Sequence, residues 1–257
     1  MGSDPLYKVF DAHFHVINSR YPLFPNKGYL PDEFTCMDYL RRVRDLHILG
    51  GAVVSGSFQR FDQTYLLSAL EQLGSSFVGV TQLPRSVTDE EVLQLNAAGV
   101  RAIRFNLKRG GSEAVRHIDS MSRRLYDLAG WHTELYTSSE ALPDLFNILV
   151  ALPSVSIDHL GLSRNGFDTL LKLVERGAYV KATGFGRVDF DIGSALRDIY
   201  AANPESLMFG TDLPSTRAPR PFDDRDMILV LETLGNEAAK NVLWENAFRF
   251  YGLGGSG

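Results

Sequence analysis

Short apolar segments, each followed by a segment with helical spacing of its apolar residues, recur eight times along this chain. The first helical segment, 34–49, shows the spacing in Met37, Leu40, Val43 and Leu46. Regular alternation of strands and helices requires a parallel sheet, because parallel neighbours are joined by a crossover that usually contains a helix. The predicted strands are 9–15, 52–57, 77–83, 100–107, 131–137, 155–160, 177–183 and 207–211.

Eight such units within 257 residues predict an α/β fold with one domain, a (β/α)8 TIM barrel over residues 6–252. An open doubly wound sheet would carry a Gly-x-Gly-x-x-Gly turn after its first strand, and this chain has Asp-Ala-His-Phe-His there instead. We expect a long loop at 18–32 and a flexible tail at 253–257. The predicted helices are 34–49, 63–73, one that starts with a Thr88–Glu91 capping box, 114–129, 141–151 with Pro143 in its first turn, 167–175, 192–202, 226–234 and 237–250.

The composition excludes some classes of partner. The formal net charge is −5, which disfavours a nucleic-acid groove or an anionic membrane surface. No run of about 18 apolar residues is present, so no membrane span is expected. Cys36 is the single cysteine and cannot form an internal disulfide, which suits a reducing compartment. We therefore expect a cytoplasmic protein, and the sequence leaves its oligomeric state open.

Chemically active side chains follow the strands at the end where barrel enzymes carry their sites. His13 and His15 share one face of the first strand, because side chains alternate along a strand. Any one of these residues could be structural, and we assign His47, His117 and His132 no function, with His47 and His117 placed inside helices. The other candidates are His159 and Asp212 at the ends of strands six and eight, Tyr136 at the end of strand five, Arg104, Lys108 and Arg109 on and after strand four, Arg187 after strand seven, and Ser57 at the end of strand two.

These residues resemble the amidohydrolase superfamily, in which an Asp-x-His-x-His strand, a later histidine and a final aspartate share one site. Finer motifs are similar to its 2-pyrone-4,6-dicarboxylate lactonase branch. They are Arg-Phe-Asn at 104–106, Trp-His-x-Glu-Leu-Tyr at 131–136, Asp-His-Leu-Gly at 158–161, Lys-x-x-Gly at 181–184 and Gly-Thr-Asp-x-Pro at 210–214. The resemblance covers essentially the whole chain.

The resemblance implies a hydrolase that opens a lactone bearing carboxylates. Asp212 is the expected base that activates water. We expect its pKa to be lowered, because it lies among cations. His13, His15 and His159 are expected to polarise the carbonyl, and Tyr136 to donate a hydrogen bond to the same oxygen or to a substrate carboxylate. The expected substrate-binding residues are Arg104, Arg187, one of Lys108 and Arg109, Ser57, and Tyr29 from the long loop.

Two alternatives stay open beside this hypothesis. Tyr136 stands where most metal-dependent members carry a histidine, and the resemblance implies that the lactonase branch works without a metal. One zinc ion held by His13, His15, His159 and Asp212 would instead indicate a zinc-dependent hydrolase or decarboxylase. A barrel that only binds small carboxylates is the third possibility. The expected partner in each case is a small molecule, with neither nucleic acid nor membrane.

Overall fold

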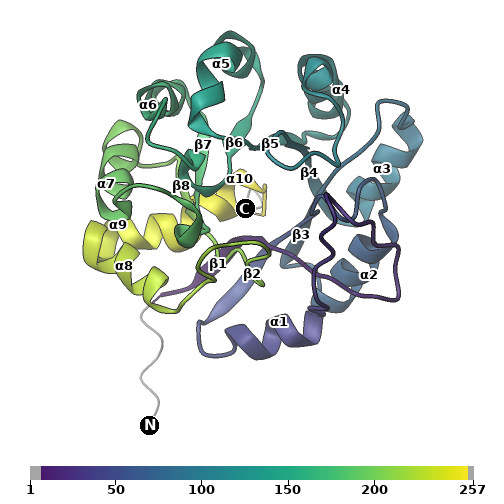
Figure 1. The fold of residues 1–257 in the computed structure, drawn as a ribbon, viewed down its shortest axis with the longest axis horizontal. Coiled ribbons are helices and arrows are strands. Elements are labelled where there is room, and N and C mark those ends of the chain that lie inside the picture. Colours follow the sequence, from purple (N-terminus) through teal and green to yellow (C-terminus); the bar gives the residue numbers. More distant parts are fainter. Residues whose placement is uncertain (1–6, 254–257) are drawn as a thin grey trace.

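The computed structural model describes residues 7–253, and the parallel barrel predicted from the sequence is confirmed (Figure 1). Each strand pairs in parallel with the next one along the chain, from β1 through β8. The backbone N–H of Asp212 donates to the carbonyl of His13 across 2.7 Å, and His15 N–H donates to Leu213 across 2.7 Å, so the segment after β8 joins the end of β1. The strands are β1 (Val9–Phe14), β2 (Ile48–Val54), β3 (Phe77–Thr81), β4 (Val100–Asn106), β5 (His132–Tyr136), β6 (Val155–Ile157), β7 (Tyr179–Ala182) and β8 (Leu207–Phe209).

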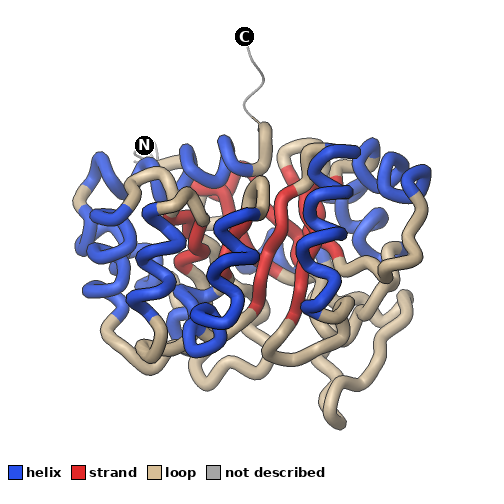
Figure 2. The backbone as a smooth tube through the Cα atoms, turned by 90° about the horizontal axis from the view of Figure 1, so that it is seen from above, coloured by secondary structure: helices blue, strands red, loops and turns tan. Residues whose placement is uncertain are grey.

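Helices surround the strands, and loops gather at one end of the barrel (Figure 2). The capping box at Thr88 and the place of Pro143 in a first turn are both confirmed. The helices are α1 (Cys36–Val43), α2 (Thr64–Leu73), α3 (Asp89–Ala97), α4 (Ile118–Ala129), α5 (Leu142–Ala151), α6 (Phe167–Glu175), α7 (Ile192–Ala202), α8 (Arg225–Leu234), α9 (Asn236–Lys240) and α10 (Asn246–Phe250), with a π-helical stretch at Asn241–Glu245 inside the predicted last helix. No helix of the described part is long and apolar enough to cross a membrane.

The predicted helix 34–49 is wrong at its end. The helix stops at Val43, His47 lies in a turn rather than in a helix, and β2 begins at Ile48. The sequence predicts that Gly50 and Gly51 end a helix, yet both lie inside β2. Glycine is needed at these positions because the neighbouring backbone leaves no room for a side chain. A Cβ on Gly50 would lie 2.4 Å from the carbonyl oxygen of Ser76.

The barrel interior has an apolar half and a polar half. Phe10, Ala12 and Met208 belong to a buried apolar cluster that also includes Tyr251, which directly follows α10. The Tyr251 hydroxyl donates to Glu134 inside the barrel across 2.7 Å. Since α10 occupies one end of the barrel, the polar carboxyl-end residues are left at the other end. Of the predicted tail, residues 254–257 lie outside the described part, and Leu253 packs against this cluster.

Candidate active site

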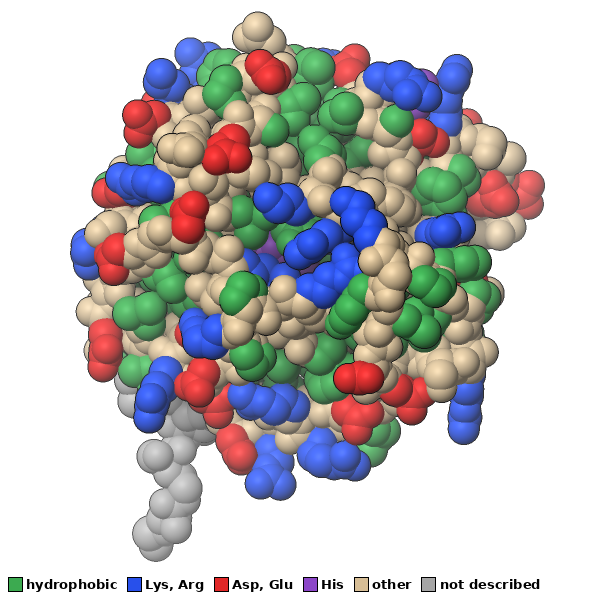
Figure 3. All heavy atoms as spheres, viewed as in Figure 1, with side chains coloured by type: hydrophobic (Ala, Val, Ile, Leu, Met, Phe, Trp, Pro, Cys, Tyr) green, Lys and Arg blue, Asp and Glu red, His purple; other side chains and the backbone are tan. Residues whose placement is uncertain are grey.

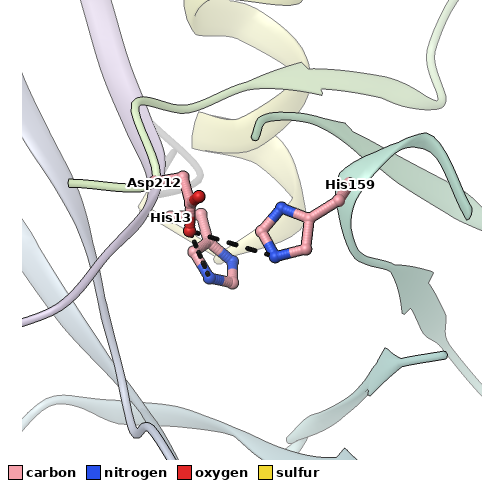
Figure 4. Close-up of side chains that lie close together, drawn as sticks. All are labelled: His13, His159 and Asp212. Atoms are coloured by element: carbon pink, nitrogen blue, oxygen red, sulfur yellow. Dashed lines mark ion pairs between the residues drawn. The ribbon is translucent and has the colours of Figure 1, made fainter. Parts of the chain in front are cut away.

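Four side chains from three strand ends surround one point inside the barrel mouth. Oδ1 of Asp212 lies 3.9 Å from Nε2 of His13, 3.8 Å from Nε2 of His15 and 3.9 Å from Nε2 of His159. Figure 4 shows His13 directly beside Asp212 and His159 reaching toward the same point from the other side of the view. All four are buried. The residues paired from sequence alone thus meet in space, although they are up to 199 positions apart.

The backbone at this point is held in an uncommon conformation. His159 and Asp212 have φ values of 53° and 60°, which lie in the left-handed region that non-glycine residues rarely adopt. The predicted strand six ends early, at Ile157, and His159 lies in the short helical turn that follows. Gly184 packs under His159, where a Cβ would lie 2.7 Å from the ring Nδ1. Such strained residues concentrate at functional sites.

Burial keeps the histidines neutral. Desolvation lowers the pKa of His13 and His159 well below the ordinary value, and it lowers the pKa of His15 to about 3. Nδ1 of His15 lies 2.7 Å from the carbonyl oxygen of Val54, which can only accept, so Nδ1 carries the proton. Nε2 of His15 is therefore an acceptor directed at the site. This corrects the expectation that His15 polarises a carbonyl, because a neutral ring in this tautomer cannot donate from Nε2.

The two oxygens of Asp212 have different surroundings. Oδ2 accepts a hydrogen bond from Nε of Arg187 across 2.6 Å, while Oδ1 has no hydrogen-bond partner among the described residues. Burial raises the pKa of Asp212, although the Arg187 charge and hydrogen bond act in the lowering direction. The expected lowering is therefore wrong: the carboxylate is almost fully enclosed, and loss of hydration outweighs the neighbouring cations. A raised pKa makes Asp212 a stronger base.

A buried ionic network lies next to the histidines. Arg104 donates to Asp158 through Nε (3.1 Å) and Nη2 (2.8 Å), and Nζ of Lys181 lies 2.5 Å from Glu134. Nδ1 of His13 lies 3.4 Å from Oδ1 of Asp158, so the network reaches the site. Burial acts to raise the pKa of Glu134, but Lys181 and His132 outweigh it and the pKa falls to about 2. Glu134 and Asp158 are not among the predicted site residues, although they lie inside the motifs at 131–136 and 158–161.

The mouth of the site is a cationic hollow. Figure 3 shows Lys and Arg side chains around a central depression with histidine visible inside it. Lys108 is exposed and lies outside this pocket, so of the two neighbouring cations that follow β4, Arg109 is the one that lines it, together with Arg104 on the strand itself. Arg217 also lines it and was missed, although it follows strand eight closely enough for the same strand-end rule to find it. The pocket holds about 390 Å³ and is lined by His15, Tyr29, Gly56, Ser57, Phe58, Arg104, Asn106, Arg109, Tyr136, His159, Arg187, Asp212, Thr216 and Arg217.

The donor set fits a divalent metal ion, whereas the surrounding charge opposes one. His13, His159 and Asp212 each offer one ligand atom, and these atoms lie within 4.8 Å of one another. Nε2 of His13 and Oδ1 of Asp212 are buried without a hydrogen-bond partner in the described part of the chain. Neutral imidazoles and a carboxylate are ligands that zinc accepts. Against this, the guanidinium of Arg187 is already bound to the same carboxylate.

Known proteins that are similar to this chain include hydrolases. The model of the amidohydrolase family matches residues 10–253. The chain is 31% identical to a 2-pyrone-4,6-dicarboxylate hydrolase of Comamonas testosteroni over 174 residues, which cover 62% of this chain and 55% of that protein. It is 23% identical to a 4-sulfomuconolactone hydrolase of Rhizobium radiobacter, with 95% of this chain and 90% of that one covered.

A solved structure from Pseudomonas putida, described as a 2-pyrone-4,6-dicarboxylic acid hydrolase, superimposes on this chain with a TM-score of 0.81. It is 26% identical and is matched over 96% of this chain and 98% of its own. The match with the Comamonas relative spans only about half of that relative's length.

Proposed function

The chain belongs to the amidohydrolase family of hydrolases, and from this premise we propose that it opens a small lactone bearing carboxylate groups, similar to 2-pyrone-4,6-dicarboxylate, without a metal. The relatives named above as lactone hydrolases agree with the predicted enzyme class. The observation that carries the proposal is Asp212, a buried carboxylate with one oxygen bound to Arg187 and the other facing three neutral histidines. A cytoplasmic location stays a prediction.

The reaction starts from a water molecule between Asp212 and His15. Both Oδ1 of Asp212 and Nε2 of His15 accept hydrogen bonds, so together they orient the water and aim its lone pair at the lactone carbonyl. Asp212 takes a proton as the new carbon–oxygen bond forms. The ring carbon–oxygen bond then breaks, and the oxygen released from the ring takes the proton from Asp212. The carboxylic acid formed at the former carbonyl carbon loses its proton to solvent, so the product carries one carboxylate more than the substrate.

The developing oxyanion needs donors, which His15 cannot supply. His159 can donate from Nε2 in the tautomer that leaves its Nδ1 unprotonated, because the hydroxyl of Thr183 can donate to that Nδ1 across 2.7 Å. Nδ1 of His13 faces the acceptor Oδ1 of Asp158 at 3.4 Å, which favours a proton on Nδ1 and leaves Nε2 of His13 as an acceptor. Tyr136 lines the same pocket and offers a hydroxyl. Donors fixed in this way before reaction are worth about 3 kcal/mol each in related acyl chemistry.

The arginines divide into paired and unpaired groups. Arg104 and Arg187 line the pocket, but each already bonds an internal carboxylate, Asp158 and Asp212. Their remaining N–H groups can still donate to substrate, although their charge is balanced. Arg109 has no ion-pair partner within the described residues and is the predicted clamp that keeps its full charge. Ser57 and Tyr29 complete the wall of the pocket, as expected from the sequence.

A zinc-dependent hydrolase or decarboxylase is the second candidate, favoured by the unpartnered His13 Nε2 and Asp212 Oδ1. His13, His159 and Asp212, with His15 beside them, would hold the ion. Zinc would polarise the substrate carbonyl as a Lewis acid. In that case Arg187 would keep its bond to Oδ2 of Asp212 and orient the carboxylate toward the ion.

Metal analysis of the purified protein, combined with a panel of carboxylated lactones assayed with and without chelator, separates these candidates. We expect turnover of at least one dicarboxylated lactone, far less than one metal per chain, and a rate unchanged by chelator. About one metal per chain, with activity lost on chelation and restored by zinc, would establish the second candidate instead. Tight binding of the lactones without any turnover would identify a barrel that only binds carboxylates.

A further inference from the structure

Two arginines, Arg109 and Arg217, line the mouth of the site, and no residue from 7 to 253 forms an ion pair with either. Arg109 follows β4 and Arg217 follows β8, and both line the inner pocket and the adjoining outer cavity of about 660 Å³. Burial lowers the pKa of Arg217, and the charge of Arg109 lowers it further, as expected for neighbouring like charges.

The position of Arg217 is fixed by the long first loop. Its Nη2 donates to the carbonyl oxygen of Asn26 across 2.5 Å, and its guanidinium lies 4.1 Å from the centre of the Tyr29 ring. The side-chain amide of Asn26 donates in turn to the carbonyl oxygen of Arg109 across 3.2 Å. Residues 26–29 therefore hold the guanidinium of Arg217 and bond the backbone of Arg109, without an acidic partner for either side chain among the described residues.

The nearest carboxylates of the outer cavity are engaged elsewhere. Oε1 of Glu140 accepts hydrogen bonds from Ser163 and Asn165, at 3.3 and 3.2 Å. Asp189 accepts one from the backbone N–H of Arg164 at 3.1 Å. Asp158 and Asp212 neutralise the inner arginines. The lining cations without an ion-pair partner among residues 7–253 are Arg109 and Arg217, which line both the pocket and the outer cavity, and Lys108, which lines the outer cavity alone.

We propose that Arg109 and Arg217 form an outer anion subsite, which binds the acidic group of the substrate that lies farthest from the scissile carbonyl. Arg217 is thereby a specificity-determining residue that the strand-end motifs do not include. The subsite takes a carboxylate or a sulfonate, because a guanidinium pair can offer parallel N–H donors to either anion. This inference rests on the proposed lactone hydrolysis and specifies that the substrate carries two anionic groups.

The test compares Arg217→Gln with the unaltered enzyme on two lactones, one with two carboxylates and one that lacks the distal carboxylate. We expect KM for the dicarboxylate to rise about 10- to 100-fold with kcat changed less than about threefold. KM for the monocarboxylate should stay within about twofold. Arg20→Gln is the matched control, since Arg20 is an exposed arginine of the same long loop that lines neither cavity, and it should change neither value.

An equal rise in KM for both lactones would overturn the subsite and leave Arg217 with the role of holding the Tyr29 loop. A separate measurement covers the case in which no lactone is turned over. Calorimetry with isophthalate and benzoate, aromatic rings with two carboxylates and one, should show tighter binding of isophthalate and loss of that preference in Arg217→Gln. Equal affinity for both acids in the unaltered protein would refute the subsite, whatever the reaction is.

Discussion

Arg187 donates from Nε to Oδ2 of Asp212 across 2.6 Å, and this bond leaves Oδ1 as the carboxylate oxygen that faces the histidines. The interaction has two consequences. It holds the carboxylate in one orientation, and its positive charge limits how far burial can raise the pKa of Asp212. Asp212 is thus kept basic enough to accept a proton and ionised enough to act near neutral pH.

Replacing Arg187 with Met should move the acid limb of the pH–rate profile to higher pH. The arginine lowers the pKa of Asp212 against the effect of burial, so its removal raises that pKa and protonates the base over a wider range. We expect the apparent pKa of the acid limb of kcat/KM to rise by about one unit or more, with an activity loss of about tenfold or greater at neutral pH. Arg197→Met, on the exposed surface of α7, is the control. A limb at its original pH would show that the arginine does not tune the base.

Replacing Asp212 with Asn should reduce kcat by about 10²- to 10⁴-fold, because the amide cannot accept the proton from water. Substrate binding should persist, since the cations of the mouth remain. Single-turnover kinetics and calorimetry with the same lactone give the two values. Asp198→Asn removes an exposed carboxylate with 43% side-chain exposure and should leave both unchanged. Retention of more than about a tenth of the activity in Asp212→Asn would exclude this residue as the base.

Replacing Lys181 with Met should destabilise the protein by about 3–5 kcal/mol, because Glu134 would be left as an unpaired charge inside the barrel. The double variant Lys181→Met/Glu134→Leu should recover most of that loss. Denaturant unfolding measures both. Lys240→Met breaks the exposed pair with Glu237 and should change stability by less than about 1 kcal/mol. If the double variant is no more stable than Lys181→Met alone, the unpaired charge of Glu134 is not the cause of the destabilisation.

The buried histidines should make the protein sensitive to acid. A histidine whose pKa is depressed in the folded state stays neutral there and takes up a proton only on unfolding. Its contribution to the free energy of unfolding is therefore complete above pH 6.5 and is lost as the pH falls toward the folded pKa. Asp11, whose pKa burial raises to about 6, acts in the opposite direction, and a variant comparison is therefore needed.

His15→Gln isolates this effect, since glutamine can keep the bond to Val54 and does not titrate. Relative to the variant, the unaltered protein should lose about 1.4 kcal/mol per pH unit below pH 6.5. Unfolding in denaturant at about pH 7.5 and about pH 4.5 supplies the comparison. His117→Gln, in a short helical turn before α4, is the control. A stability difference that is the same at both pH values would rule out His15 as a source of acid sensitivity.

The order of strands and helices was readable from local patterns. Apolar spacing and capping residues depend on neighbours a few positions away, so the α6 and α7 boundaries agree with the prediction. The wrong prediction of where β2 begins has a non-local cause. Gly50 and Gly51 are required by the backbone of adjacent strands, and that contact does not exist until the barrel closes.

The sequence by itself also determined which residues share the mouth, because barrel topology brings every strand's carboxyl end to one side, and His13, His15, His159 and Asp212 follow from that rule. Only the tertiary structure decided which charges are balanced. The pairing of Arg187 with Asp212, the choice of Arg109 over Lys108, and the unpaired Arg217 all depend on distances across the barrel. Burial, which raised the pKa of Asp212 instead of lowering it, is a property of the whole packed chain and has no counterpart in local sequence.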